Sequence, residues 1–154
     1  MGSIARRTLL SGGVLTLGIW GLRTAGAQGA GTWVITAPEA SMPQSPTSKA
    51  GRSISRGPAI RQVSPEGAVA ANKPFNLRIE FAGRGGEKIA PGTAQVVLLR
   101  GSNIDITQRV KAYITPTGIV IPDAMVAPGT HVLQVAVSDD RGHQSTANIE
   151  IDAK

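Results

Sequence analysis

Residues 127–143 read Ala-Pro-Gly-Thr-His-Val-Leu-Gln-Val-Ala-Val-Ser-Asp-Asp-Arg-Gly-His, and this stretch decides the class of the fold. After a Pro-Gly turn, Leu133, Val135 and Val137 stand at every second position, separated by Gln and Ala. A period of two is typical of a β-strand with one buried face. We therefore predict a central strand on which Leu133 and Val135 face inward, ended by an acidic turn at residues 139–142.

The same chemistry extends on both sides of this strand. Short apolar or alternating runs are separated by turns rich in Pro, Gly and Asp, and no stretch shows a useful helical period. The run at 95–100 is apolar on both faces, which favours a central position in a sheet. Together these runs predict an all-β, immunoglobulin-like sandwich of about seven antiparallel strands. The predicted strands cover residues 75–81, 95–100, 110–114, 119–121, 133–137 and 147–151.

Composition limits the chemistry that the chain can perform. Aromatic residues make up 3% of the sequence and cysteine is absent, so the core must consist of Val, Ile, Leu and Ala. Without cysteine there is no disulfide, lipid-bearing cysteine, thiolate metal site or thiol nucleophile. The net charge is +6, but residues 62–154 carry equal numbers of acidic and basic side chains. The basic excess lies in residues 1–61, so we expect no nucleic-acid partner.

The N-terminus carries an export signal in its residue pattern. Arg6 and Arg7, followed after one residue by Leu9 and Leu10, resemble the twin-arginine export motif. The apolar stretch from 8 to 22 is broken by four glycines. It is also shorter than the roughly 20 apolar residues that cross a bilayer. We interpret residues 1–27 as a twin-arginine-type signal peptide, with an ordinary secretory signal or an uncleaved anchor as alternatives.

The end of this segment has the small residues that signal cleavage requires. Ala25 and Ala27 flank a glycine, so we expect the mature chain to begin at Gln28. Each of the three interpretations of the N-terminus places the folded part outside the cytoplasm. We expect a periplasmic or secreted protein with no stable membrane span after cleavage.

Residues 28–58 are predicted to link the signal to the folded domain at 59–154. From Thr36 onward Pro, Ser, Thr, Ala and Gly dominate, with little apolar surface to offset the entropy of ordering. We expect a disordered, partly extended linker. The apolar residues 33–35 just before it could add an edge strand, but a frayed segment is the expectation.

Two family resemblances are carried by the same stretches. Residues 127–143 resemble the last hairpin of bacterial immunoglobulin-like domains, and 64–67 with 74–81 resemble the first hairpin. This resemblance implies the sandwich fold and no particular function. More faintly, Ser138 to His143 resembles the Ser-x-Asp-Gly-His turn of periplasmic copper carriers of the copper-resistance C type, with one residue inserted. That family also uses an N-terminal histidine, where this chain has Gln28.

The candidate metal ligands are the histidines and the acidic turn. His143 lies beside Asp139 and Asp140, and imidazole with carboxylate suits copper. His131 lies at the far end of the same strand, so we expect the two histidines not to share an ion. One histidine with two carboxylates leaves the coordination incomplete, and we predict weak metal binding at best.

Other patterns give no catalytic site. The glycine-rich residues 83–88 lack the spacing of a phosphate-binding loop, and no serine elbow or carboxylate pair stands out. We predict a non-enzymatic exported module without a cofactor, which binds another envelope or periplasmic protein by pairing at a sheet edge. The alternative function is a periplasmic copper-binding carrier.

Overall fold

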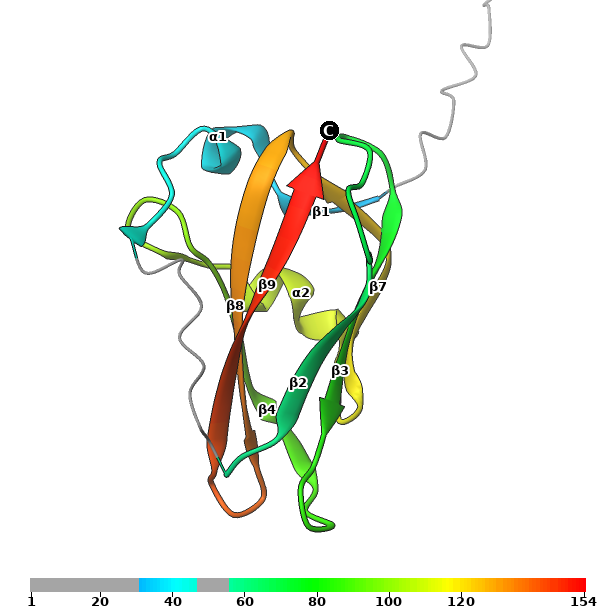
Figure 1. Cartoon of the computed structure of the whole chain (residues 1–154), viewed down its shortest axis with the longest axis vertical. Helices are drawn as coiled ribbons and strands as arrows, with labels where there is room; N and C mark the ends of the chain where they lie inside the picture. Colours follow the sequence, from blue (N-terminus) through cyan, green and yellow to red (C-terminus); the bar gives the residue numbers. More distant parts are fainter. Residues whose placement is uncertain (1–30, 47–55) are drawn as a thin grey trace, which may run out of the picture.

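The computed structural model describes residues 31–46 and 56–154, whose strands form a two-sheet β-sandwich (Figure 1). The predicted signal peptide and residues 28–30 and 47–55 of the predicted linker, including the predicted mature N-terminus Gln28, lie outside the described residues. The elements, in chain order, are β1 (Thr32–Ile35), α1 (Ala37–Ala40), β2 (Ala59–Ser64), β3 (Phe75–Ala82), β4 (Ile89–Leu98), β5 (Ile104–Asp105), α2 (Thr107–Val110), η2 (Lys111–Tyr113), β6 (Ile114–Thr115), β7 (Gly118–Val126), β8 (Gly129–Asp139) and β9 (Gln144–Ala153).

The sheets divide the strands between two layers. One sheet, here the β7 sheet, has the order β1-β7-β3-β2 with β6 paired to β7; the other, the β8 sheet, has the order β5-β4-β8-β9. The all-β sandwich is therefore confirmed. The described part of the chain holds nine strands, where the sequence predicts about seven. The named strands within the predicted domain at 59–154 all pair antiparallel, and the parallel pairing of β7 is with β1, which precedes that domain.

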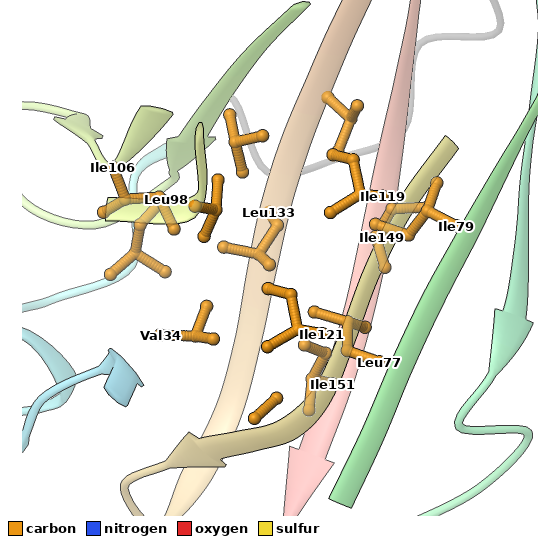
Figure 2. Packing of buried hydrophobic residues seen from close by; sticks show 14 of the residues in the cluster. Val34, Leu77, Ile79, Leu98, Ile106, Ile119, Ile121, Leu133, Ile149 and Ile151 are labelled. Atoms are coloured by element: carbon orange, nitrogen blue, oxygen red, sulfur yellow. The ribbon is translucent and has the colours of Figure 1, made fainter. Parts of the chain in front are cut away.

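The core is aliphatic, as the composition requires. Leu133 is 1% exposed and Val135 is fully buried, and β8 lies between β4 and β9, so the inward-facing central strand is confirmed. Figure 2 shows side chains from both sheets meeting in the space between them. The labelled members of this cluster are Val34, Leu77, Ile79, Leu98, Ile106, Ile119, Ile121, Leu133, Ile149 and Ile151.

Residues 107–113 are helical, and the predicted strand over 110–114 is wrong except at its last residue, where β6 begins. Ile106 and Val110 are each 1% exposed and stand four positions apart, which places both on one face of the helical turn. In the sequence alone, the alternating apolar residues after Val110 fit a strand equally well. Packing of the turn against β4 decides in favour of the helix.

The segment before the predicted linker is docked, which corrects the expectation that residues 33–35 are frayed. They form part of β1, which extends the β7 sheet by pairing in parallel with β7. Val34 and Ile35 are fully buried. A short strand without such packing is not stable in water, so the burial of these two side chains is what holds the segment in place.

The prediction of a disordered linker over 36–58 is also wrong for residues 36–46. Thr36 donates hydrogen bonds from its backbone N–H and its Oγ1 hydroxyl to the Glu39 carboxylate, both at 2.8 Å. These contacts hold the start of α1, and Pro38 is tolerated in the first turn because no helical partner for its missing N–H is needed there.

Two arginines fasten this segment to the sandwich. Arg109 of α2 donates to the Val34 carbonyl at 2.7 Å and to both carboxylate oxygens of Glu39 at 2.8 and 3.0 Å. Arg100 donates to the Met42 carbonyl at 2.6 Å. We call the Arg109–Glu39 pair the N-terminal clamp. The two hydrogen bonds between one guanidinium and one carboxylate stabilise residues 36–46, which have little apolar surface to bury.

Candidate functional site

The β8–β9 turn places Asp139 and His143 side by side. Asp139 ends β8, and its Oδ1 atom accepts hydrogen bonds from the backbone N–H groups of Arg141 at 3.0 Å and His143 at 2.8 Å. Gly142 supplies the left-handed conformation that the turn needs, with φ of +83°. The turn therefore fixes one oxygen of Asp139 and leaves Oδ2 free to face the imidazole.

A second loop brings Glu87 to the same place. Ile89 at the start of β4 pairs with Asp139 at the end of β8, so the residues before Ile89 lie against the turn. The backbone N–H of Asp140 donates to the Lys88 carbonyl at 2.9 Å and joins the two loops. Gly83 is needed beneath Glu87, because a Cβ there would collide with the Glu87 carbonyl.

Glu87, Asp139 and His143 form a three-ligand cluster, here the acid–histidine cluster, with one ligand atom each within 4.8 Å of one another. The Nδ1 atom of His143 lies 3.0 Å from Asp139 Oδ2 and 4.0 Å from Glu87 Oε2. The side chains of Asp139, Glu87 and His143 are 1%, 13% and 44% exposed. The cluster therefore has a buried carboxylate floor and an imidazole open to solvent.

The electrostatics of Asp139 keep it ionised. Burial works to raise its pKa, but hydrogen bonds, among them those from the backbone N–H of His143, the His143 ring and the backbone N–H of Arg141, lower the pKa to about 2. Asp139 thus offers a carboxylate at neutral pH beside the second carboxyl group of Glu87. Two adjacent acids of this kind favour a cation between them.

The structure places the three candidate metal ligands of the sequence analysis, Asp139, Asp140 and His143, in one turn, but not in one cluster. Asp139 and His143 meet as the sequence suggests. Asp140 is exposed, its backbone N–H joins the two loops, and its side chain is not part of the cluster of Glu87, Asp139 and His143. Glu87 is the third member of the cluster, and the glycine-rich pattern of residues 83–88 carries no signal of a metal ligand in the sequence.

His131 has a structural position away from this cluster. It is fully buried, and its Nε2–H donates to the Ala127 carbonyl at 2.8 Å. Burial lowers its pKa, with Arg100 adding to the effect, so the ring is neutral. His131 pairs with Ile151 near the end of β9, whereas His143 directly precedes the start of that strand. The two histidines therefore lie at opposite ends of the β8–β9 hairpin.

The edge of the β8 sheet at β9 is already covered along part of its length. Val69 donates to the Asp152 carbonyl at 2.8 Å and accepts from the Lys154 N–H at 2.9 Å. The Gln62 side chain donates to the Glu150 carbonyl at 3.4 Å. These contacts occupy backbone groups that edge pairing with a partner strand would use.

The chain was compared with known proteins at three levels. No protein-family model matches it, and no curated protein sequence matches it. Among solved structures, the crystal structure of CopC from Methylosinus trichosporium OB3b is similar over 62% of this chain and 95% of that chain, with 18% identity and a TM-score of 0.38. At this level the likeness assigns no ligand to this chain. Within residues 31–46 and 56–154, no helix has the length and apolar character to cross a membrane.

Proposed function

We propose that this chain is an exported, non-enzymatic carrier of a divalent transition-metal ion, copper(II) first, bound by Glu87, Asp139 and His143. One observation carries the proposal: ligand atoms from two loops converge within 4.8 Å around a buried, oriented carboxylate. The proposal of export rests on the Arg6-Arg7 motif, and a periplasmic location follows from it.

The donor set favours a borderline metal over a hard one. One imidazole nitrogen with two carboxylate oxygens suits Cu²⁺ or Zn²⁺, whereas Ca²⁺ takes six or more oxygens. Among first-row dications Cu²⁺ binds such sites most strongly. The ion would replace the hydrogen bond that now joins His143 Nδ1 and Asp139 Oδ2.

The exposure of the cluster supports transport over a structural role. Three protein ligands leave at least one coordination position for water or for a ligand from another protein. His143 is 44% exposed, so an ion bound there is within reach of a second molecule. Function as a protein-binding module would draw on open sheet edges, and the β9 edge is partly covered.

Titration of Cu²⁺ into the full-length, tag-free chain tests the proposal. We expect one equivalent to bind, and we expect His143→Ala and Glu87→Gln each to weaken the affinity by about tenfold or more. Asp140→Asn is the matched control, because it removes a neighbouring carboxylate that is not a ligand. Binding lost equally in Asp140→Asn, or kept in His143→Ala, would overturn the site.

A further inference from the structure

A positive charge is built into the rim of the acid–histidine cluster. The Nη1 atom of Arg141 lies 3.0 Å from Glu87 Oε1, and the arginine side chain is 69% exposed while Glu87 is 13% exposed. Arg141 is part of the turn itself, since its backbone N–H donates to Asp139 Oδ1. Arg141 therefore stands two residues from each of two proposed ligands, Asp139 and His143.

This guanidinium engages the same carboxylate that a metal ion needs. Glu87 has one oxygen, Oε1, against Arg141 and the other, Oε2, toward the imidazole of His143. Two carboxylates and a dication sum to a neutral site, whereas adding Arg141 leaves an excess positive charge beside the ion. The Arg141 guanidinium and a dication bound at the cluster would repel each other, and this repulsion is strongest at low salt, where screening is weakest.

We propose that Arg141 is a built-in competitor for the metal: it occupies Glu87 through its guanidinium, lowers the affinity of the cluster for a dication, and so favours release of the cargo. This inference rests on the proposed function and assigns a regulating role to a residue that is not itself a ligand. It also gives a role to the Arg141–Glu87 ion pair, in which the exposed arginine makes a single contact that contributes little to stability.

Lys88 provides a natural comparison. It is adjacent to Glu87 in the chain and carries the same charge, yet it is exposed and forms no ion pair within the described residues. If general positive charge near the site set the affinity, Lys88 and Arg141 would act alike. If direct contact with Glu87 sets it, only Arg141 matters.

The test is Cu²⁺ titration of the full-length Arg141→Gln, Lys88→Gln and Arg141→Lys variants, at low and at high salt. We expect Arg141→Gln to bind about two- to fivefold more tightly at low salt, with the gain shrinking as salt screens the lost charge. Lys88→Gln should stay within about twofold of wild type by the same screening. Arg141→Lys keeps the charge and should stay close to wild type.

The failures are distinguishable. If wild type binds Cu²⁺ through His143 but Arg141→Gln binds no more tightly, or Lys88→Gln gains as much, the competitor role is overturned and the metal site stands. If wild type binds no stoichiometric Cu²⁺, or binding is unchanged in His143→Ala, the proposed function fails and the competitor role falls with it.

Discussion

Two arginine–glutamate pairs at different places on the sandwich have nearly the same shortest distance, and their surroundings give them opposite roles. The N-terminal clamp joins Arg109 to Glu39 at 2.8 Å, and the rim of the cluster joins Arg141 to Glu87 at 3.0 Å. In Figure 1, α1, which carries Glu39, lies at the opposite end of the sandwich from the β8–β9 turn. Distance alone therefore does not tell a structural ion pair from a replaceable one.

The difference lies in what else each glutamate contacts. Glu39 is surrounded by donors: a bidentate guanidinium and two groups of Thr36. The hydrogen bond from Arg109 is the largest cause that lowers the pKa of Glu39, to about 2, and Glu39 in turn raises the pKa of Arg109. Glu87 instead stands beside another carboxyl group and an imidazole. A satisfied carboxylate holds the fold, and an under-satisfied one is available to a cation.

The largest expected effect comes from breaking the strand that supports both regions. Leu133 is 1% exposed in the middle of β8, between Arg100-linked Thr130 and the Asp139 turn. Replacing it by alanine should destabilise the protein by about 2–5 kcal/mol, because a buried cavity remains. Urea unfolding would measure it. A loss under about 0.5 kcal/mol would mean that the strand is not central to the fold.

Most of the fold could be predicted because its signals are local. The alternation in β3, β8 and β9 is written in each strand, and the turn residues mark their ends. The helical turn after Ile106 could not be predicted in this way. Apolar residues at 106 and 110 fit a helix, whereas those at 110, 112 and 114 fit a strand. Only the packing against β4 decides between them.

The N-terminal segment was missed for a different physical reason. Its strand pairs with β7, about 90 residues away in the chain, and its clamp reaches Arg109 at a separation of 70 residues. Thr36 and Glu39 do carry a local capping signal, which the proline-rich composition obscured. Composition measures average disorder tendency, and it does not count individual hydrogen bonds.

The candidate site also combines residues that are near in the sequence with one that is brought in from far along the chain. Asp139 and His143 lie in one turn, so sequence spacing alone suggests that they meet. Glu87 is separated from Asp139 by about 50 residues, and only the pairing of Ile89 with Asp139 brings it near. The register of β4 on β8 shifts between Ala90 and Gln95, so extending the pairing of residues 95–100 with 133–137 does not bring Ile89 opposite Asp139.

A smaller effect, specific to the clamp, is expected from Glu39→Gln. Removing the charge weakens the bonds from Arg109 and Thr36, and hydrogen bonds to charged groups contribute about 1–3 kcal/mol. We expect a loss in this range at neutral pH, measured by urea unfolding. Hydrogen exchange should also speed up in residues 32–40 while the β8 strand stays protected. Faster exchange spread evenly over the sandwich would contradict a local clamp.

The Glu39→Gln variant also tests how the stability of the protein depends on pH. The pKa of Glu39 falls from its usual value of 4.5 to about 2 in the folded chain, so its stabilisation is complete above the unfolded value and is lost as pH falls through the folded one. The gap in stability between wild type and Glu39→Gln should therefore close between about pH 5 and pH 2. Asp139 titrates in both proteins and cancels in the difference.

The smallest effect is expected at the other pair. Arg141 is 69% exposed and makes one contact with Glu87, so water solvates most of its guanidinium in the folded chain. Ion pairs with a largely solvated partner of this kind contribute about 0–1 kcal/mol. Arg141→Gln should therefore change the free energy of unfolding by less than about 0.5 kcal/mol, whereas Arg109→Gln, which strips a bidentate clamp and a backbone carbonyl of their donor, should cost several times more. Parallel urea unfolding of the two variants is the measurement. Equal losses would erase the distinction between the two pairs, since Arg141 would then be a structural clamp like Arg109 and would not be free to give way to a metal ion.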